Sequence, residues 1–434
     1  MRYFTEDVFG VTSQKVIESF IKRDEVESAF SSALKSCRQI VIYGSSKQGK
    51  TLLVRTHFKI NETLTIELSP NMHLTDLYRA ILRQAGVAIQ LKYEEGSGKS
   101  LSTTIKSRFS AAVAMIAKGE IEAGVTAKDK SDKKIEFETI SFNLALPQDV
   151  GELLQKINFD KPIILENFHY LSEENQKAFS IDLRSFADMN FRFIILGVWQ
   201  DQNHLLQFNG DLVDRLSEVT VEPWLEKDFK KIIEKGSLLL NIELSDEIIN
   251  RCIDCSFGNV GIFQELIKET LLNSNIRTAQ QTKTRIESEK GILKAVESKR
   301  HSYSVRSTRA LETLAVNSQL RTEEDKTPFY LSYYLVIAIL KLGFEGIKKG
   351  LTIDVLFKKI KSFHHRPHDL KKGQVTRILH NISENQNKKS IQPPIFFYDR
   401  YSKKLRIVDA TFLFFMRNAP LKTIIKDIPN PCEE

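Results

Sequence analysis

Near the amino end of the chain, eight consecutive residues have the types and spacing of a phosphate-binding loop. Residues 44–51 (Gly-Ser-Ser-Lys-Gln-Gly-Lys-Thr) match the pattern G-x-x-x-x-G-K-[ST] in full. The pattern predicts a backbone that folds around phosphate oxygens, with Lys50 neutralising the β- and γ-phosphates and the Thr51 hydroxyl binding Mg²⁺. ATP and Mg²⁺ are therefore the expected ligands. The predicted nucleotide-binding residues are Gly44, Ser45, Ser46, Lys47, Gln48, Gly49, Lys50 and Thr51.

A carboxylate follows a short apolar stretch further along the chain. Residues 163–165 (Ile-Ile-Leu) precede Glu166 and Asn167. An acid at the end of a buried strand is where a phosphate-binding-loop enzyme holds Mg²⁺, so Glu166 is predicted to be a catalytic residue and, with Thr51, a metal ligand. The next position usually carries an acid that polarises the attacking water, and the Asn167 amide cannot take a proton. We therefore expect slow hydrolysis, in which Glu166 could act as the base through a water molecule.

Two further residues are candidates for contact with the γ-phosphate. Gln200 follows the predicted strand that ends at Leu196, and we assign it a catalytic, phosphate-sensing role. Arg215 precedes another predicted strand and could reach a phosphate held by a neighbouring subunit, as an arginine finger does. An ordinary surface ion pair explains Arg215 equally well.

Alternating strands and helices are expected to position these residues. Apolar runs predict strands at 39–43, 64–68, 162–165, 191–196 and 218–221, and helices at 13–36, 52–54, 74–85, 149–157 and 173–187. Because several strands are continuously apolar, the pattern predicts an α/β fold with a parallel sheet. Residues 87–148 fit less well and are predicted to be a partly flexible insertion with hairpin character.

The second half of the chain reads as helical and then mixed. Helices are predicted at 226–239, 245–254 and 259–273, followed by a polar, basic helical stretch over 276–327. From Pro328 onward, helices at 329–342, 353–360 and 370–385 precede strands at 393–398 and 405–408, which is the winged-helix order. A last apolar segment, 411–417, precedes a polar tail.

The net charge of +8 is concentrated at the carboxyl end. Residues 341–434 hold 19 Lys and Arg against 9 Asp and Glu, or +10, and the first 340 residues sum to −2. In a winged helix that binds double-stranded DNA, the third helix and the wing contact the duplex. An acidic protein partner remains the alternative to DNA. The candidate DNA-binding residues are Lys358, Lys359, Lys371, Lys372, Arg377, Lys403 and Lys404.

Composition excludes several classes of protein. With 41% apolar and 27% charged residues, the chain is neither wholly disordered nor collagen-like, and four scattered cysteines exclude a small disulfide scaffold. No apolar run approaches the roughly 20 residues of a membrane span, so no membrane association is expected. The first residues lack the pattern of a signal peptide, and a cytoplasmic location is expected. The pair Cys252 and Cys255 is interpreted as packing, and 364–368 as a solvated or phosphate-facing loop.

Together these residues resemble the AAA+/STAND class of P-loop ATPases, especially the branch near origin-recognition-like ATPases. The resemblance rests on 23–25, the P-loop, 165–171, 211–215 with 223–224, and the carboxyl-terminal winged-helix pattern. It implies an AAA+ αβα core, a helical lid over the nucleotide, and ATP-driven homo-oligomerisation, with DNA or a regulatory protein as target. Two departures, Asn167 and a glycine at Gly261 where such proteins often carry Arg, imply weak hydrolysis with nucleotide binding retained. Arg23 and Asp24 either border the adenine site or lie on a plain helix surface.

The resemblance also gives the predicted domains and functions. The domains are an ATPase core at 1–224 with the insertion at 87–148, a helical lid at 225–275, a helical connector at 276–327 and a winged-helix-like domain at 328–434. The favoured function is a switch ATPase whose nucleotide state controls oligomerisation or binding of an effector or sensor protein, and many STAND members act in bacterial signalling or antiviral defence. The alternatives are a DNA-binding ATPase of the initiator or transposition-regulator type, and a module that holds ATP without hydrolysing it.

Overall fold

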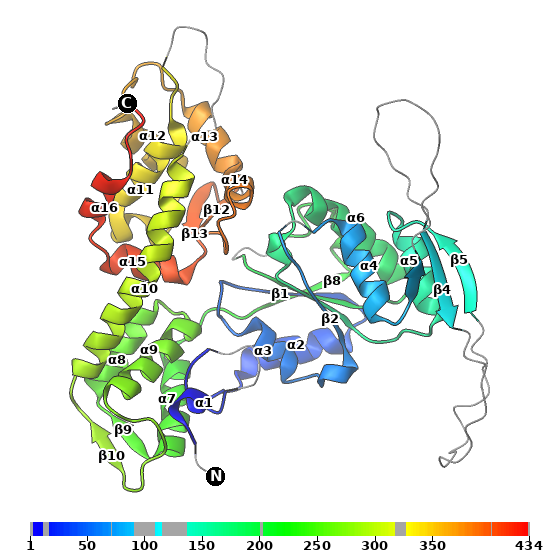
Figure 1. Ribbon diagram of the computed structural model, residues 1–434, viewed down its shortest axis with the longest axis horizontal. Helices are drawn as coiled ribbons and strands as arrows, with labels where there is room; N and C mark the ends of the chain where they lie inside the picture. Colours follow the sequence, from blue (N-terminus) through cyan, green and yellow to red (C-terminus); the bar gives the residue numbers. More distant parts are fainter. Residues whose placement is uncertain are drawn as a thin grey trace.

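The computed structural model describes residues 3–11, 17–70, 72–90, 109–114, 137–199, 203–316, 327–400 and 402–432. Its centre is a five-stranded parallel sheet with the strand order β2-β6-β7-β1-β8 (Figure 1). The strands are β1 (Gln39–Tyr43), β2 (Leu64–Glu67), β6 (Ile163–Glu166), β7 (Phe193–Gly197) and β8 (Leu216–Thr220). The predicted α/β fold with a parallel sheet is confirmed.

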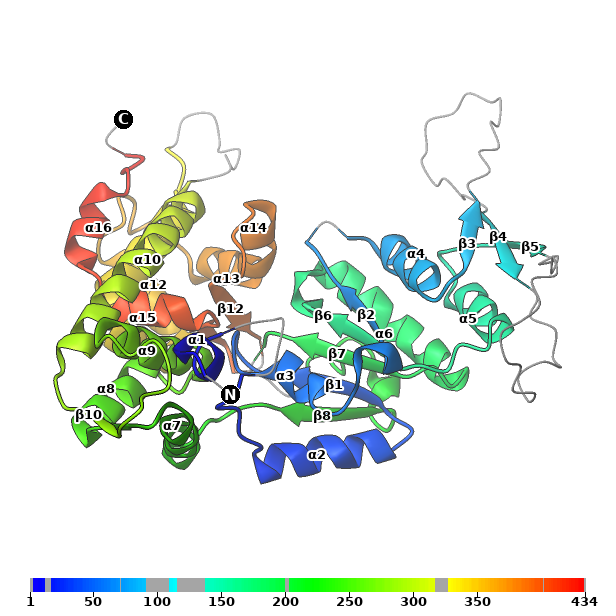
Figure 2. The same cartoon turned by 60° about the horizontal axis from the view of Figure 1, so that its bottom comes forward.

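Two hydrophobic cores cover the two faces of this sheet. In β1, Val41 and Tyr43 belong to one core and Ile40 and Ile42 to the other, because successive side chains of a strand point to opposite faces. The helices that supply side chains to the first core are α4 (Leu74–Gln84), α5 (Pro147–Lys156) and α6 (Glu173–Asp188), and those of the second are α2 (Asp24–Lys35) and α3 (Lys50–Arg55). Figure 2 shows α2 on one side of the sheet and α4 and α6 on the other. The central strands β1, β6 and β7 are almost entirely buried because both faces are covered, whereas the edge strands β2 and β8 combine buried and more exposed residues.

The segment predicted as an insertion contains a small antiparallel sheet. Its strands are β3 (Ala88–Gln90), β4 (Phe109–Ala114) and β5 (Phe137–Phe142), in the order β3-β4-β5. The predicted hairpin character is confirmed, since β4 pairs antiparallel with both neighbours. Figure 1 places β4 and β5 beside α5, at the end of the molecule away from α10.

A helical unit follows β8. It contains α7 (Glu226–Leu240), β9 (Ile242–Leu244), α8 (Asp246–Ser256) and α9 (Val260–Asn273), and it packs against α1 (Thr5–Val8). The stretch predicted to be a helical connector begins instead with β10 (Thr284–Ile286), which pairs parallel with β9. It continues as the 26-residue helix α10 (Lys290–Ala315).

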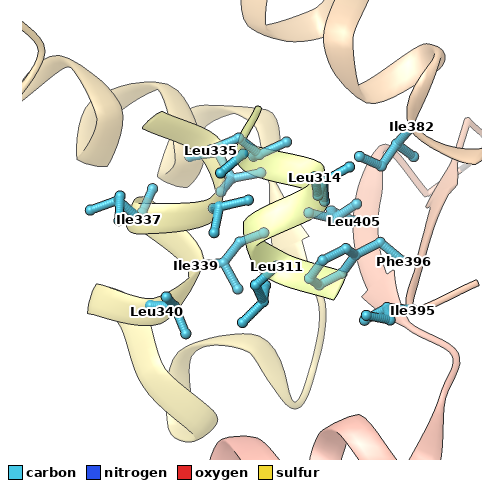
Figure 3. Close-up of a cluster of buried hydrophobic side chains, with 14 of the residues drawn as sticks. Leu311, Leu314, Leu335, Ile337, Ile339, Leu340, Ile382, Ile395, Phe396 and Leu405 are labelled. Carbon is cyan, nitrogen blue, oxygen red and sulfur yellow. The ribbon is translucent and has the colours of Figure 1, made fainter. Parts of the chain in front are cut away.

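The carboxyl-terminal part combines helices with a three-stranded antiparallel sheet, β11-β13-β12. Its elements in chain order are α11 (Leu331–Ile347), β11 (Leu351–Thr352), α12 (Ile353–Lys361), α13 (Lys372–His380), α14 (Ile382–Lys388), β12 (Phe396–Asp399), β13 (Lys404–Ile407), α15 (Ala410–Asn418) and α16 (Leu421–Asp427). Figure 3 shows Leu311 and Leu314 of α10 packed among side chains of α11 and of the β12–β13 region. The carboxyl-terminal half of α10 therefore belongs to the core of the elements that follow it, and Ile292 and Ala295 of its first half belong to the core of the helical unit before it.

Three sequence-based element predictions differ from the structure. Of the helix expected over 13–36, residues 13–16 lie outside the described residues, residues 17–23 are not helical, and the helix α2 begins at Asp24. The helix expected over 370–385 is divided between α13 and α14 at Asn381, whose φ and ψ of −95° and 6° are not helical. The polar tail contains the helix α16.

Across the part of the chain that the structure describes, no helix is long and apolar enough to cross a membrane.

Candidate nucleotide-binding site

The predicted phosphate-binding loop connects β1 to α3. Gly44 and Gly49 have φ angles of 147° and 89°, which residues with a side chain rarely adopt, and a Cβ at Gly44 would lie 2.8 Å from Val221 Cγ2. The Lys50 ammonium donates to the carbonyl oxygens of Gly44 (2.8 Å) and Ser45 (2.7 Å). Burial lowers the pKa of Lys50 to about 8, against the attraction of Glu222. The loop therefore holds a buried amine that gains from an anionic ligand.

Glu166 ends β6 beside the start of α3. Its carboxylate accepts a hydrogen bond from the Thr51 side chain and is attracted by Arg55, but burial is the larger effect and raises the pKa of Glu166. The structure thus brings together the two side chains that the sequence assigned to Mg²⁺. A hydroxyl and a carboxylate oxygen side by side suit a hard divalent cation, so these residues fit the metal.

Asn167 occupies a turn directly after Glu166. Its φ of 60° is left-handed, and its amide donates to Glu67 Oε1 at 3.4 Å. Asn167 and Glu166 both line the cavity beside the P-loop, so Asn167 lies at the same end of the sheet as the loop.

That cavity has a volume of about 310 Å³. Its wall away from the loop is largely apolar and includes Ile17, Ile21, Trp224, Ile232 and Val260. The guanidinium of Arg23 lies 3.9 Å from the centre of the Trp224 ring and donates to the Val221 carbonyl at 2.8 Å. A charged loop beside an apolar wall suits a ligand with a phosphate chain and a planar base. The sequence allows Arg23 either to border the base-binding site or to lie on a plain helix surface, and the structure places it in the wall of the cavity.

The start of α9 contacts the outer side of the P-loop. Asn259 Nδ2 donates to the Ser46 carbonyl at 2.7 Å, and the Gly261 N–H donates to the Lys47 carbonyl at 3.1 Å. A Cβ at Gly261 would lie 2.5 Å from Lys47 Cβ and 2.9 Å from Lys47 O. The glycine that stands in place of the expected Arg is therefore required by the close approach of two backbones.

Gln48 fastens the same loop from three sides. Its amide nitrogen donates to Glu222 Oε1 at 2.6 Å, its side-chain oxygen accepts from the Val260 N–H at 3.3 Å, and its carbonyl accepts from Trp224 Nε1 at 3.3 Å. Glu222, Asn259 and the role of Gln48 as a clamp were not evident from the sequence. Asn259 does carry a local signal, since its side chain caps α9 by accepting from the Ile262 N–H.

The structure does not bring the other two predicted catalytic residues into this site. Gln200 lies outside the described residues. Arg215 precedes β8 at the edge of the sheet opposite the P-loop, where its carbonyl accepts from the Gln39 N–H at 2.8 Å. Its guanidinium forms an ion pair with Asp188 on the surface. A role for Arg215 toward a neighbouring subunit remains a prediction.

The candidate DNA-binding residues lie on or beside α12, α13 and the β12–β13 turn. The side chains of Lys371, which immediately precedes α13, and of Arg377 on α13 are exposed, and Lys372 pairs with Asp354 at 2.5 Å. Lys358 and Lys403 are also exposed, and Lys359 and Lys404 are half-buried. Their contact with DNA remains a prediction.

The sheet, the loop after its strand β1 and the acid at the end of β6 define an α/β P-loop nucleoside-triphosphatase fold. No protein-family model matches the chain, and no curated protein matches it. Among solved structures, the chain is similar to the Walker-type ATPase of Pyrococcus abyssi, with a TM-score of 0.49 at 13% identity over 94% of this chain and 99% of that one.

Two further solved structures are similar over most of the chain. The Orc1 protein of Aeropyrum pernix, in complex with DNA, gives a TM-score of 0.41 at 12% identity over 94% of this chain and 95% of that one. RuvB of Thermotoga maritima gives a TM-score of 0.39 at 12% identity over 89% of this chain and 92% of that one. At these values the assignment of the fold rests on the sheet and the loop themselves.

Proposed function

We propose that the protein binds ATP with Mg²⁺ and hydrolyses it slowly, as a nucleotide-controlled switch. The observation that carries this proposal is the meeting of Lys50, Thr51 and Glu166 in one cavity of about 310 Å³ with an apolar wall. The P-loop amides and Lys50 would hold the phosphates, and Thr51 and Glu166 would hold Mg²⁺, which when bound supplies charge neutralisation at the β- and γ-phosphates. Asn167 leaves the usual water-polarising position without a carboxylate, which favours slow turnover.

The contacts of α9 support control of protein assembly by the nucleotide. Asn259 and Gly261 donate hydrogen bonds to carbonyls of the P-loop. A change in the conformation of the loop when ATP binds therefore shifts the position of α9. We propose that this movement controls self-assembly or binding of an effector or sensor protein. A role in bacterial antiviral defence follows from the STAND resemblance and predicts a nuclease or toxin gene beside this one.

Nucleotide binding tests the central proposal. Lys50→Ala removes a buried cation that bonds to phosphate, and each charge-assisted hydrogen bond contributes about 1.5–3 kcal/mol. MgATP affinity, measured by titration with a fluorescent ATP analogue, is expected to fall at least about tenfold. Lys177→Ala, a change at an exposed lysine of α6, is the matched control and should leave the affinity unchanged. Equal affinity for MgATP in the wild type and in Lys50→Ala would contradict the assignment of Lys50 and the P-loop to phosphate binding. Sizing with and without ATP tests the assembly step.

A second candidate function, binding to double-stranded DNA through a winged-helix-like domain, is favoured by the exposed basic side chains of α13. Neutralising about six phosphates predicts a slope of roughly −5 for log affinity against log salt. Lys371→Ala and Arg377→Ala should each reduce the slope by about one. Lys388→Ala, in which the exposed lysine is already paired with Glu384, is the control. A flat salt response would exclude this function.

A further inference from the structure

The reaction proposed above lacks a carboxylate at the usual place. Asn167 occupies that place, and its φ of 60° in a tight turn leads directly into the short helix Phe168–Tyr170. An amide can donate to a phosphate oxygen or to a carboxylate, but it is a weaker acceptor than a carboxylate for the hydrogen of an attacking water. If the chain hydrolyses ATP, either Glu166 serves as both metal ligand and base, or another acceptor near this edge of the sheet orients the water.

A carboxylate does lie there, on the neighbouring strand. Glu67 is the last residue of β2, and the register of the parallel pair places it opposite Glu166. The next backbone bond, from the Leu68 N–H to the Glu166 carbonyl, is 3.0 Å long. Since parallel strands end at one edge of a sheet, Glu67 lies at the same edge as the P-loop.

A direct contact connects this carboxylate to the cavity. Asn167, which lines the cavity, donates through Nδ2 to Glu67 Oε1 at 3.4 Å. The pair therefore carries an amide and a carboxylate on adjacent strands, with the carboxylate on β2 instead of directly after β6. Glu67 is exposed, so its side chain is free to change rotamer toward the phosphate side while Asn167 still limits its direction.

We propose that Glu67 replaces the missing second acid and orients the attacking water in ATP hydrolysis. The Glu67 carboxylate accepts a hydrogen bond from the water, whose oxygen bonds to the γ-phosphorus as the bond to the bridging oxygen of ADP breaks. One hydrogen of the water stays on the oxygen that bonds to phosphorus, and the other moves to another oxygen of the phosphate product. Asn167 is a positioning residue that holds Glu67 by its amide. This inference rests on the proposed function, because it names a residue for the reaction at that site.

Single-turnover hydrolysis and nucleotide affinity, measured on the same variants, test this inference. Glu67→Gln keeps the size of the side chain and removes its charge, so we expect the hydrolysis rate to fall by about 100-fold. The affinity for MgATP, from the fluorescent analogue, should stay within about twofold of the wild type. Glu174→Gln changes an exposed acid of α6 and is the matched control. The exchange of the two side chains, Glu67→Asn with Asn167→Glu, returns the acid to the usual position and should restore hydrolysis.

The outcomes separate this inference from the proposed function. A wild type that fails to bind MgATP overturns the proposed function. A wild type that hydrolyses ATP while Glu67→Gln does so at the same rate overturns the inference alone. A wild type that binds MgATP but gives no product in a single turnover overturns the inference together with the hydrolysis step of the proposed function, because no reaction then exists for Glu67 to serve. An equal loss of rate and affinity in Glu67→Gln would assign Glu67 to binding and also contradict the inference.

Discussion

Gly261 offers the sharpest test of the contact between α9 and the P-loop. It is the second residue of α9, and its N–H donates to the Lys47 carbonyl at 3.1 Å. In Gly261→Ala, the added methyl would lie 2.5 Å from Lys47 Cβ and 2.9 Å from the Lys47 carbonyl oxygen. One of these partners is backbone, so a change of rotamer cannot relieve the contact. The P-loop and the start of α9 must therefore move apart.

The size of the effect follows from three contributions. Forcing a methyl into a packed contact costs about 1–3 kcal/mol. Losing the hydrogen bond between Gly261 and Lys47 costs about 1 kcal/mol more. Alanine in place of glycine returns up to about 1 kcal/mol of helix propensity. The closed contact is thus expected to lose about 1–3 kcal/mol, which weakens nucleotide binding by about 5- to 150-fold if the closed form is the one that binds.

The measurement is MgATP affinity, with thermal melting in the absence of nucleotide as a check on folding. Gly373→Ala is the matched control, because Gly373 is also the second residue of its helix, α13, and nothing lies within 4 Å of the added methyl. It should be neutral or slightly stabilising. If Gly261→Ala binds MgATP as tightly as Gly373→Ala does, the contact of α9 does not contribute to nucleotide binding and the reasoning fails.

Two further predictions concern buried titratable groups. Burial lowers the pKa of His204 to about 4, so the native state binds fewer protons than the unfolded chain between about pH 4 and 6.5. His204 should contribute up to about 3 kcal/mol of stability above about pH 6.5, and this contribution should be lost toward pH 4. His169, whose pKa burial lowers to about 3, adds a loss of its own in the same range, so denaturant titrations at each pH should find the fall smaller by about 3 kcal/mol in His204→Gln and unchanged in the exposed control His368→Gln. Burial raises the pKa of Cys252 to about 12, so mass spectrometry after mild alkylation of the folded protein should find Cys37, which is exposed, modified and Cys252 intact. Equal modification of the two would contradict the interpretation of the CxxC pair as packing.

The features with local signals were predictable from the sequence. The central strands are continuously apolar because helices cover both faces of the sheet, and the P-loop and Glu166 follow them at fixed offsets. Residues 17–23 show the limit of this reasoning, because their apolar positions have helical spacing but line the cavity instead. Arg23 holds this segment in place through its bond to the Val221 carbonyl and its contact with Trp224. Periodicity reports which side chains are buried and does not report what covers them.

The partners within the site could not be predicted, because they are far apart in the sequence. Asn167 and Glu67 are 100 residues apart, and Asn259 and Ser46 are 213 residues apart. No short motif connects such pairs. The strand register brings the first pair together, and the packing of α9 against the P-loop brings the second pair together. From the sequence alone, Gly261 is only a position at which similar proteins often carry Arg. In the structure, the short distance from a Cβ at this position to Lys47 gives a steric reason for glycine.

The P-loop is also connected to the carboxyl-terminal elements through α10. The Lys47 ammonium lies 5.9 Å from the centre of the Tyr303 ring, and Tyr303 packs edge-on against Phe414 of α15. Arg306, one turn further along α10, binds Asp409 at 2.5 Å, and Asp409 is only 3% exposed. Separating such a pair leaves a buried charge without its partner, which costs several kcal/mol, so this ion pair opposes separation of α10 from α15. A shift of the P-loop that displaces α9 must therefore also act on α10, and through it on the elements that carry the basic face of α13.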